Sequence, residues 1–204
     1  NAVYDAIKRV KDKKFAGGIY QFGLAEDGVG YVYDDHNKSQ IPDPVRARLA
    51  GEPQRFARNT LVVIVPRAER AHIATLADLA RPGLRVVLCH PRVPAGRYAR
   101  TLLQALEGTM LPGMRAGYAA RVLANVVSEE EQVRAVAGKV ALGEADAGIV
   151  YRSDVTPAIA SAVRVLEPPP AAQVIGEDVI AVLHDAPHPA EARTFLDLVR
   201  SDEG

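Results

Sequence analysis

Short apolar runs alternate with helical segments from residue 59 onward, and this alternation constrains the fold more than any other feature of the sequence. Apolar runs of strand length are found at residues 59–65, 84–89, 123–127, 145–151, 162–166 and 174–183. Helices are predicted over residues 75–80, 94–106, 114–122, 128–142 and 189–199. Strands that alternate with helices are typical of a mainly parallel sheet that helices cover on both faces. We therefore predict an α/β fold.

The composition excludes several classes of function without selecting one. The chain has 204 residues, enough for one large domain or two small lobes, and its formal net charge is zero. This balance does not indicate a nucleic acid or an anionic membrane as partner, and no apolar run approaches the ~18 residues of a membrane span. Cys89 is the only cysteine, and the five histidines show no metal-ligand spacing. Because no acid, base and nucleophile converge in the sequence, we expect neither an enzyme nor a bound cofactor.

Residues 143–154 place a tyrosine where α/β proteins commonly bind ligands. Gly143 is suited to end the helix predicted before it, and residues 145–151 form a short apolar strand. Tyr151 is the last residue of that strand. In open α/β sheets, ligands bind outside the carboxyl ends of the strands. Tyr151 is therefore a candidate ligand-binding residue.

Two predicted helix starts offer backbone N–H groups. Pro94 stands at the first position of one helix, where its missing donor costs nothing, so we expect the N–H groups of Ala95 and Gly96 to point outward. The small side chains at these positions would let an anion approach the backbone closely. The other start is predicted at Ser128, because a serine followed three residues later by Glu131 matches a capping box.

In this order, these motifs resemble those of the molybdate- and tungstate-binding periplasmic proteins of ABC transporters, which are type II substrate-binding proteins. The resemblance extends over residues 55–203. The runs that carry it are residues 56–66, 76–79, 93–99, 131–134 and 143–154. It implies periplasmic-binding-protein-like (type II) lobes with mainly parallel sheets flanked by helices. It also implies a small tetrahedral oxyanion, molybdate or tungstate, as ligand and the membrane permease of an ABC transporter as partner.

The resemblance further implies which groups in this part of the chain would hold the oxyanion. Carried over by motif, they are the backbone N–H of Ala95, the backbone N–H of Val133 and the hydroxyl of Tyr151. The molybdenum would be bound as its oxyanion, so no metal ligands and no cofactor are expected. We also expect a monomer, without nucleic acid, in the periplasm or outside the cell, either lipid-anchored or soluble.

The first part of the chain differs from the rest in composition. Five of the six lysines lie within the first 38 residues, whereas Arg9 is the only arginine there. This change indicates a junction of two segments near residues 51–53. The runs at residues 3–7, 17–24 and 28–34 resemble the C-terminal part of the basic membrane lipoprotein family, which binds purine nucleosides. A helix over residues 2–10 and strands over residues 19–24 and 29–33 are predicted in this segment.

These observations lead to a domain assignment and to two alternative functions. Residues 1–54 would be a segment of foreign origin, 55–66 a crossing strand, 67–152 a second lobe, and 153–204 a truncated return into the first lobe. The hydroxyl-bearing loops expected before Phe56 are not supplied by residues 1–54, so we expect incomplete lobes and half of a site. The alternatives are a purine-nucleoside-binding transport lipoprotein and the effector-binding domain of a transcriptional regulator. The regulator would need a basic recognition helix, which the sequence does not display.

Overall fold

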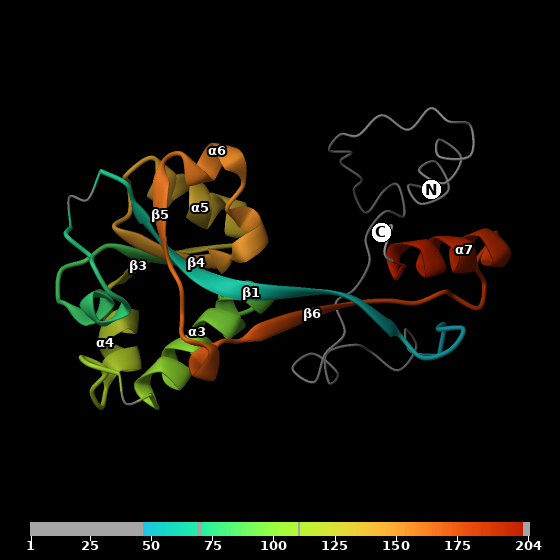
Figure 1. Cartoon of the computed structure of the whole chain (residues 1–204), viewed down its shortest axis with the longest axis horizontal. Helices are drawn as coiled ribbons and strands as arrows, with labels where there is room; N and C mark the ends of the chain where they lie inside the picture. Colours follow the sequence, from blue (N-terminus) through green and yellow to red (C-terminus); the bar gives the residue numbers. More distant parts are fainter. Residues whose placement is uncertain (1–46, 69–70, 110, 202–204) are drawn as a thin grey trace. The chain divides into compact units, whose positions relative to one another are not determined.

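The computed structural model describes residues 47–68, 71–109 and 111–201 (Figure 1). The helix and strands predicted for residues 2–33 lie outside these described residues. The chain divides into a larger unit of residues 59–176 and a smaller unit of residues 1–58 and 177–204. It passes from one unit to the other within strand β1 (Gln54–Pro66) and again within strand β6 (Ile175–Ile180).

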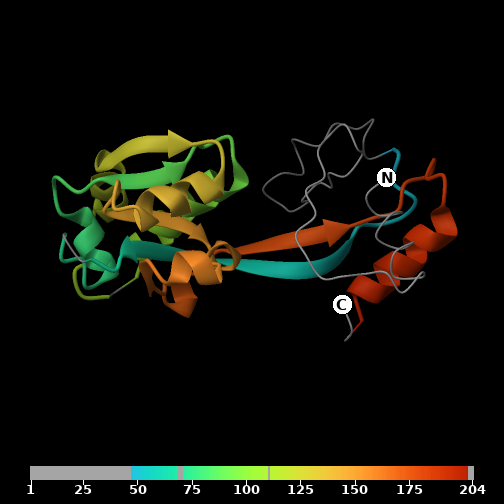
Figure 2. The ribbon, with the colours of Figure 1, turned by 90° about the horizontal axis from the view of Figure 1, so that it is seen from above.

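The larger unit is an α/β structure built on a mixed sheet with the strand order β3-β2-β4-β1-β5. Its elements after β1 are η3 (Leu76–Ala80), β2 (Val86–Cys89), α3 (Pro94–Glu107), α4 (Tyr118–Ala124), β3 (Val126–Glu130), α5 (Val133–Ala141), β4 (Ala147–Tyr151), η4 (Arg152–Asp154), α6 (Pro157–Ala160), β5 (Val163–Leu166) and η5 (Pro170–Ala172). β2 pairs in parallel with β3 and β4, and Figure 2 shows β2 and β3 side by side, pointing the same way.

The α/β class predicted from the sequence is confirmed, but the sheet is less parallel than expected. β1 pairs with β4 and β5 in antiparallel register, with Leu61 opposite Tyr151 and Val63 opposite Leu166. Among the described residues between β1 and β2, the short 3-10 helix η3 is the only regular element, and β1 does not run parallel to the strands that follow it. Alternation along the sequence therefore fixes the directions of β2, β3 and β4 but does not fix that of β1.

Both faces of this sheet are buried, as its apolar strands require. In β1, Leu61, Val63 and Val65 belong to the core cluster under α3 and α4, while Val62 and Ile64 belong to the cluster under α5. All five side chains are at most 2% exposed. Figure 1 shows α3 and α4 on one face of the sheet and α5 on the other. This alternation follows from the two-residue period of side chains along a strand.

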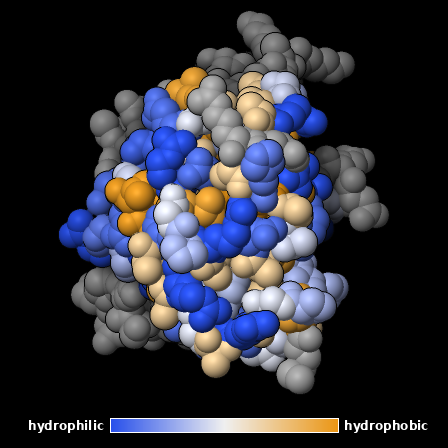
Figure 3. Space-filling view, turned by 90° about the vertical axis from the view of Figure 1, so that its left-hand side faces the viewer, coloured by the Kyte–Doolittle hydropathy of each residue, from blue (hydrophilic) through white to orange (hydrophobic). Residues whose placement is uncertain are grey.

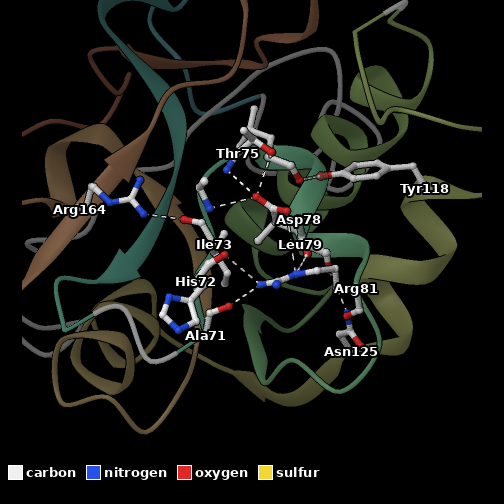
Figure 4. A network of polar contacts seen from close by, with 12 residues as sticks. Ala71, His72, Ile73, Thr75, Asp78, Leu79, Arg81, Tyr118, Asn125 and Arg164 are labelled. Atoms are coloured by element: carbon white, nitrogen blue, oxygen red, sulfur yellow. Dashed lines mark hydrogen bonds and ion pairs between the residues drawn. The ribbon is translucent and has the colours of Figure 1, made fainter.

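The segment before β2 is fastened to the helices by polar contacts (Figure 4). The hydroxyl of Tyr118 donates to the carbonyl oxygen of Leu76 at 2.7 Å. The amide of Asn125, which is 7% exposed, donates to the carbonyl oxygens of Leu79 and Arg81 at 2.9 and 2.7 Å. Buried polar groups are costly unless they are hydrogen-bonded, so these contacts fix η3 against α4.

The helix start predicted at Ser128 is wrong. Residues 126–130 form β3, whose residues Ser128, Glu129 and Glu130 lie opposite successive residues of β2. The Ser128 hydroxyl donates to the carboxylate of Glu130 and does not cap a helix. Helix α5 begins only at Val133. Pairing with β2 thus prevails over a local capping pattern.

The smaller unit contains the start of β1, most of β6 and helix α7 (Pro189–Val199). β6 pairs with β1. Arg55 forms an ion pair with Glu177 at 2.6 Å, and Arg48 forms one with Asp185 at 2.6 Å. These surface pairs contribute little stability individually.

Candidate functional site

The parallel strands of the larger unit all end at one edge of the sheet. β2 ends at Cys89, β3 at Glu130 and β4 at Tyr151, and these three strands are neighbours in the order β3-β2-β4. Helix α3 follows β2 and helix α5 follows β3, so the N-termini of both helices belong to this same edge. The three residues predicted to bind ligand, Ala95, Val133 and Tyr151, therefore all follow or end neighbouring strands at the carboxyl edge.

At the start of α3, one backbone donor remains available. Pro94 is the first helical residue, as predicted, and Ala95 is 1% exposed. Among the residues that the structure describes, the Ala95 N–H has no hydrogen-bond acceptor. The Gly96 N–H, in contrast, donates to the Val93 carbonyl oxygen at 2.9 Å. The expectation that both N–H groups point outward is therefore wrong for Gly96.

Gly96 has a structural role that the sequence did not reveal. A Cβ atom at this position would lie 2.2 Å from the carbonyl oxygen of His90 and 2.4 Å from that of Cys89. The space beside Gly96 is thus filled by the backbone at the end of β2. The absence of a side chain lets α3 approach its own strand closely, and that approach sets the position of the Ala95 N–H.

At the start of α5, Gln132 is the N-cap residue and Val133 is the first helical residue. Within the described ranges, no hydrogen-bond acceptor is found for the Val133 N–H. The Val133 side chain packs partly buried against the core cluster that includes Val136 and Val140. Its backbone is thereby fixed at the positive end of the helix dipole, where N–H groups attract anions.

Tyr151 is held from several sides at the end of β4. It lies opposite Leu61 of β1, and its ring meets the ring of Tyr98 edge-on, with 6.4 Å between the centroids and 73° between the planes. Its backbone N–H donates to the carboxylate of Asp154. The next turn is tied to β1, because the Asn59 amide donates to the Ser153 hydroxyl at 2.7 Å.

The two glutamates at the end of β3, next to the end of β2, are paired with cations. Glu129 forms an ion pair with Arg100 of α3, and Glu130 forms one with Lys139 of α5. Lys139 and the Ser128 hydroxyl hold the pKa of Glu130 below its usual range. These basic partners are distant in sequence, so no spacing rule pointed to them. Their charges offset the acidic run next to the two helix starts.

Two acidic groups at this edge, the half-buried Asp154 and the buried Cys89, have raised pKa values. Burial raises the pKa of Asp154, although the Tyr151 N–H and the charge of Arg134 act in the opposite direction. Burial also raises the pKa of the Cys89 thiol to about 11, with the carboxylates of Asp154 and Glu130 adding to the effect. A protonated thiol is a poor nucleophile, so Cys89 is not suited to covalent chemistry here.

A cavity of about 110 Å³ lies at the opposite edge of the sheet. Its lining includes Val65 at the end of β1, Arg85 before β2 and Asp146 before β4. Arg85 is already bonded to the Asp146 carboxylate at 2.9 Å and to the Gly143 carbonyl oxygen at 3.2 Å. Its charge is therefore compensated. The carboxyl edge, with two unused helix N–H groups, is the better candidate for a ligand.

Other kinds of site find little support in the part of the chain that the structure describes. There, no group of three or more His, Cys, Asp or Glu side chains is arranged to hold a metal ion. None of the described helices combines the length and the apolar character needed to span a bilayer. On the face shown in Figure 3, hydrophilic residues separate small groups of hydrophobic ones. Broad hydrophobic patches usually mark protein or membrane contacts, and this face offers no such indication among its described residues.

Comparison with known proteins gives three kinds of similarity. The model of the bacterial extracellular solute-binding protein family matches residues 36–204. The molybdate-binding protein ModA of Mycobacterium tuberculosis is 37% identical over 182 residues, which cover 89% of this chain and 64% of the relative. The chain thus spans less than two thirds of the length of this curated relative. Residues 36–54, part of the segment predicted to be of foreign origin, lie inside the family match.

Two solved structures show a similar fold. The substrate-binding domain assigned to a molybdenum ABC transporter of Clostridium difficile has a TM-score of 0.66 at 18% identity, covering 100% of this chain and 89% of that chain. The periplasmic molybdate-binding protein of Azotobacter vinelandii has a TM-score of 0.61 at 19% identity, covering 86% and 74%. At such identities the similarity establishes a periplasmic-binding-protein-like fold and leaves the ligand open.

Proposed function

Because the chain belongs to the bacterial extracellular solute-binding protein family, we propose that it binds molybdate or tungstate outside the cytoplasmic membrane and passes it to the permease of an ABC importer. The 37% identity to the molybdate-binding protein ModA supports this choice of ligand. Members of a solute-binding family carry a solute without converting it, so we propose no enzymatic activity. One observation carries the proposal: Ala95, Val133 and Tyr151 stand at one edge of the sheet, on two helix starts and a strand end.

The ligand would be held by hydrogen bonds and helix dipoles. A tetrahedral dianion needs donors that converge from several directions, and the Ala95 and Val133 N–H groups come from two different helices. Each lies at the positive end of its helix dipole, which favours negative charge. The Tyr151 hydroxyl would supply the third donor. Hydrogen bonds to a charged partner contribute about 1.5–3 kcal/mol each.

Charge compensation around the edge supports an anionic ligand. Glu129 and Glu130 would repel a dianion if they were unpaired, but Arg100 and Lys139 neutralise them. The remaining positive potential then comes from the helix N-termini. Such fixed dipoles can bind a dianion in a site from which water is excluded, without a buried cation.

Isothermal titration calorimetry with the whole chain tests this function, with molybdate, tungstate, sulfate and inosine as ligands. We expect heat with molybdate or tungstate. Tyr151→Phe should weaken that binding about tenfold to a hundredfold, because one hydrogen bond to the anion is lost. Unchanged affinity would remove Tyr151 from the site.

Tyr118→Phe is the matched control. It also removes one phenolic hydroxyl, but that hydroxyl donates to the Leu76 carbonyl oxygen within the core of the larger unit. It should lower stability and leave anion affinity unchanged. Heat with inosine alone would favour a purine-nucleoside-binding protein, and no heat with any ligand would contradict anion binding by this chain.

We further propose that the chain acts as a monomer, which sedimentation velocity would test. The domain assignment also remains a proposal: residues 1–54 as a segment of other origin, of which residues 36–54 lie inside the family match, 55–66 as the crossing strand, 67–152 as the second lobe and 153–204 as a truncated return into the first lobe. In addition to an extracellular location, we propose a lipid anchor, which mass spectrometry of the protein from its native membrane would test.

A further inference from the structure

Tyr98 connects two of the proposed ligand groups. It lies on α3, three residues after Ala95, and is 2% exposed. Its ring meets the ring of Tyr151 edge-on at a centroid distance of 6.4 Å. Aromatic pairs at 4.5–7 Å favour this arrangement, because the positive ring edge faces the negative ring face. A single helix thus carries both the Ala95 N–H and the aromatic contact to the Tyr151 phenol.

Gly176 of β6 lies near the same aromatic pair. A Cβ atom on Gly176 would lie 3.6 Å from Cε1 of Tyr151 and 3.6 Å from Cε2 of Tyr98. It would also lie 3.7 Å from the carbonyl oxygen of Asn59. These are ordinary van der Waals distances, so the space beside both rings at Gly176 is about the size of one methyl group.

The backbone that carries Tyr151 is fixed independently of its ring. Asp154 accepts the Tyr151 N–H, and the Asn59–Ser153 hydrogen bond of 2.7 Å fastens the turn that follows. With the backbone held, the direction of the phenol depends on the torsions of the side chain alone. The ring contact with Tyr98 acts on those torsions.

We propose that Tyr98 is a positioning residue that aims the Tyr151 hydroxyl at the anion bound by the α3 N-terminus. The inference rests on the proposed function, because it assigns Tyr98 a role only through Tyr151. The proposed role of Tyr98 explains how the Ala95 N–H of α3 and the Tyr151 hydroxyl at the end of β4 are aligned with each other. A shift of α3 would move the Ala95 N–H and the support of the phenol together.

A double-mutant cycle measured by molybdate titration tests this role. Tyr98→Leu removes the ring contact and should weaken molybdate binding about twofold to twelvefold, which corresponds to the strength of an aromatic pair. Tyr98→Phe keeps the ring and should restore affinity to within about twofold of the wild type. In a Tyr151→Phe background, Tyr98→Leu should cause no further loss, because the hydroxyl that it positions is gone.

The outcomes separate this inference from the proposed function. If Tyr151→Phe leaves the wild-type affinity unchanged, the proposed function fails at that residue. If Tyr151→Phe weakens binding and Tyr98→Leu costs the same in both backgrounds, Tyr98 acts on the core in general and the positioning role is refuted. Tyr118→Phe is again the control, because its hydroxyl donates to the Leu76 carbonyl oxygen away from the proposed site and its loss should leave affinity unchanged.

Circular dichroism and thermal melts of each variant establish that it is folded. If Tyr98→Leu does not fold, Tyr98→Met takes its place, because methionine adapts to irregular core space without supplying a ring. The same cycle then decides the question: loss of affinity only in the presence of the Tyr151 hydroxyl supports the inference, and equal loss in both backgrounds overturns it.

Discussion

Replacing Gly96 with alanine tests the close approach of α3 to β2 most directly. The added methyl group would lie 2.2 and 2.4 Å from two backbone carbonyl oxygens, whereas real contacts of this kind stay beyond 3.0 Å. The backbone cannot yield as a side-chain end could, so we take the upper part of the usual overpacking cost, about 3 kcal/mol. Alanine in a helix recovers about 1 kcal/mol of this relative to glycine. The net destabilisation should be about 2 kcal/mol.

Thermal and urea unfolding measure this effect. For a chain of this size, a loss of about 2 kcal/mol lowers the Tm by roughly 4–8 °C. Gly138→Ala in α5 is the matched control, since no atom lies within 4 Å of its new Cβ. It should stabilise the protein by about 0.5–1 kcal/mol. If Gly96→Ala were as stable as Gly138→Ala, the close packing of α3 on β2 would be refuted as the reason for glycine at position 96.

Two further predictions concern titratable groups. Burial alone would raise the pKa of Asp146, but hydrogen bonds and charge from Arg85 hold this pKa below its usual value. The ionised carboxylate therefore stabilises the folded protein above about pH 4, and this stability is lost as the pH falls through the lowered pKa. Asp146→Asn should therefore lower the free energy of unfolding at pH 7 by about 1–2 kcal/mol in urea melts, a value that allows for solvent screening of the partly exposed Arg85–Asp146 pair. The difference from the wild type should shrink below about pH 4, and a constant difference down to pH 2 would contradict this prediction. Because burial raises the pKa of Cys89 to about 11, a thiol reagent at pH 7 should label it no faster than the protein unfolds. Rapid labelling of folded protein would be inconsistent with this burial.

Much of the architecture could be predicted from the chain itself. The apolar runs at residues 59–65, 84–89 and 145–151 form buried strands, and Pro94 begins α3, because burial on both faces and the geometry of proline act locally. Tyr151 stands at a strand end for the same reason. Val133 was reached only through family resemblance, since the residues alone placed a helix start five positions earlier.

The errors arose where distant parts of the chain decide between local alternatives. Ser128 and Glu131 have the spacing of a capping box, yet pairing with β2 makes residues 126–130 a strand. A glycine at position 96 is equally compatible with an anion or with another backbone segment packed against the helix. Only the fold shows that the carbonyl groups of Cys89 and His90 fill this space. Contacts such as Tyr98–Tyr151 carry no spacing signal at all.

The position of β1 between β4 and β5 has a consequence for how the larger unit forms. This strand precedes the rest of the unit in sequence, but its sheet neighbours β4 and β5 come last. At a synthesis rate of 5–20 residues per second, β4 emerges about 85 residues and roughly 4–17 s after the middle of β1. During that interval the apolar residues of β1 lack the strands that they pair with, so the nascent chain is most prone to aggregate before β4 and β5 have been synthesised.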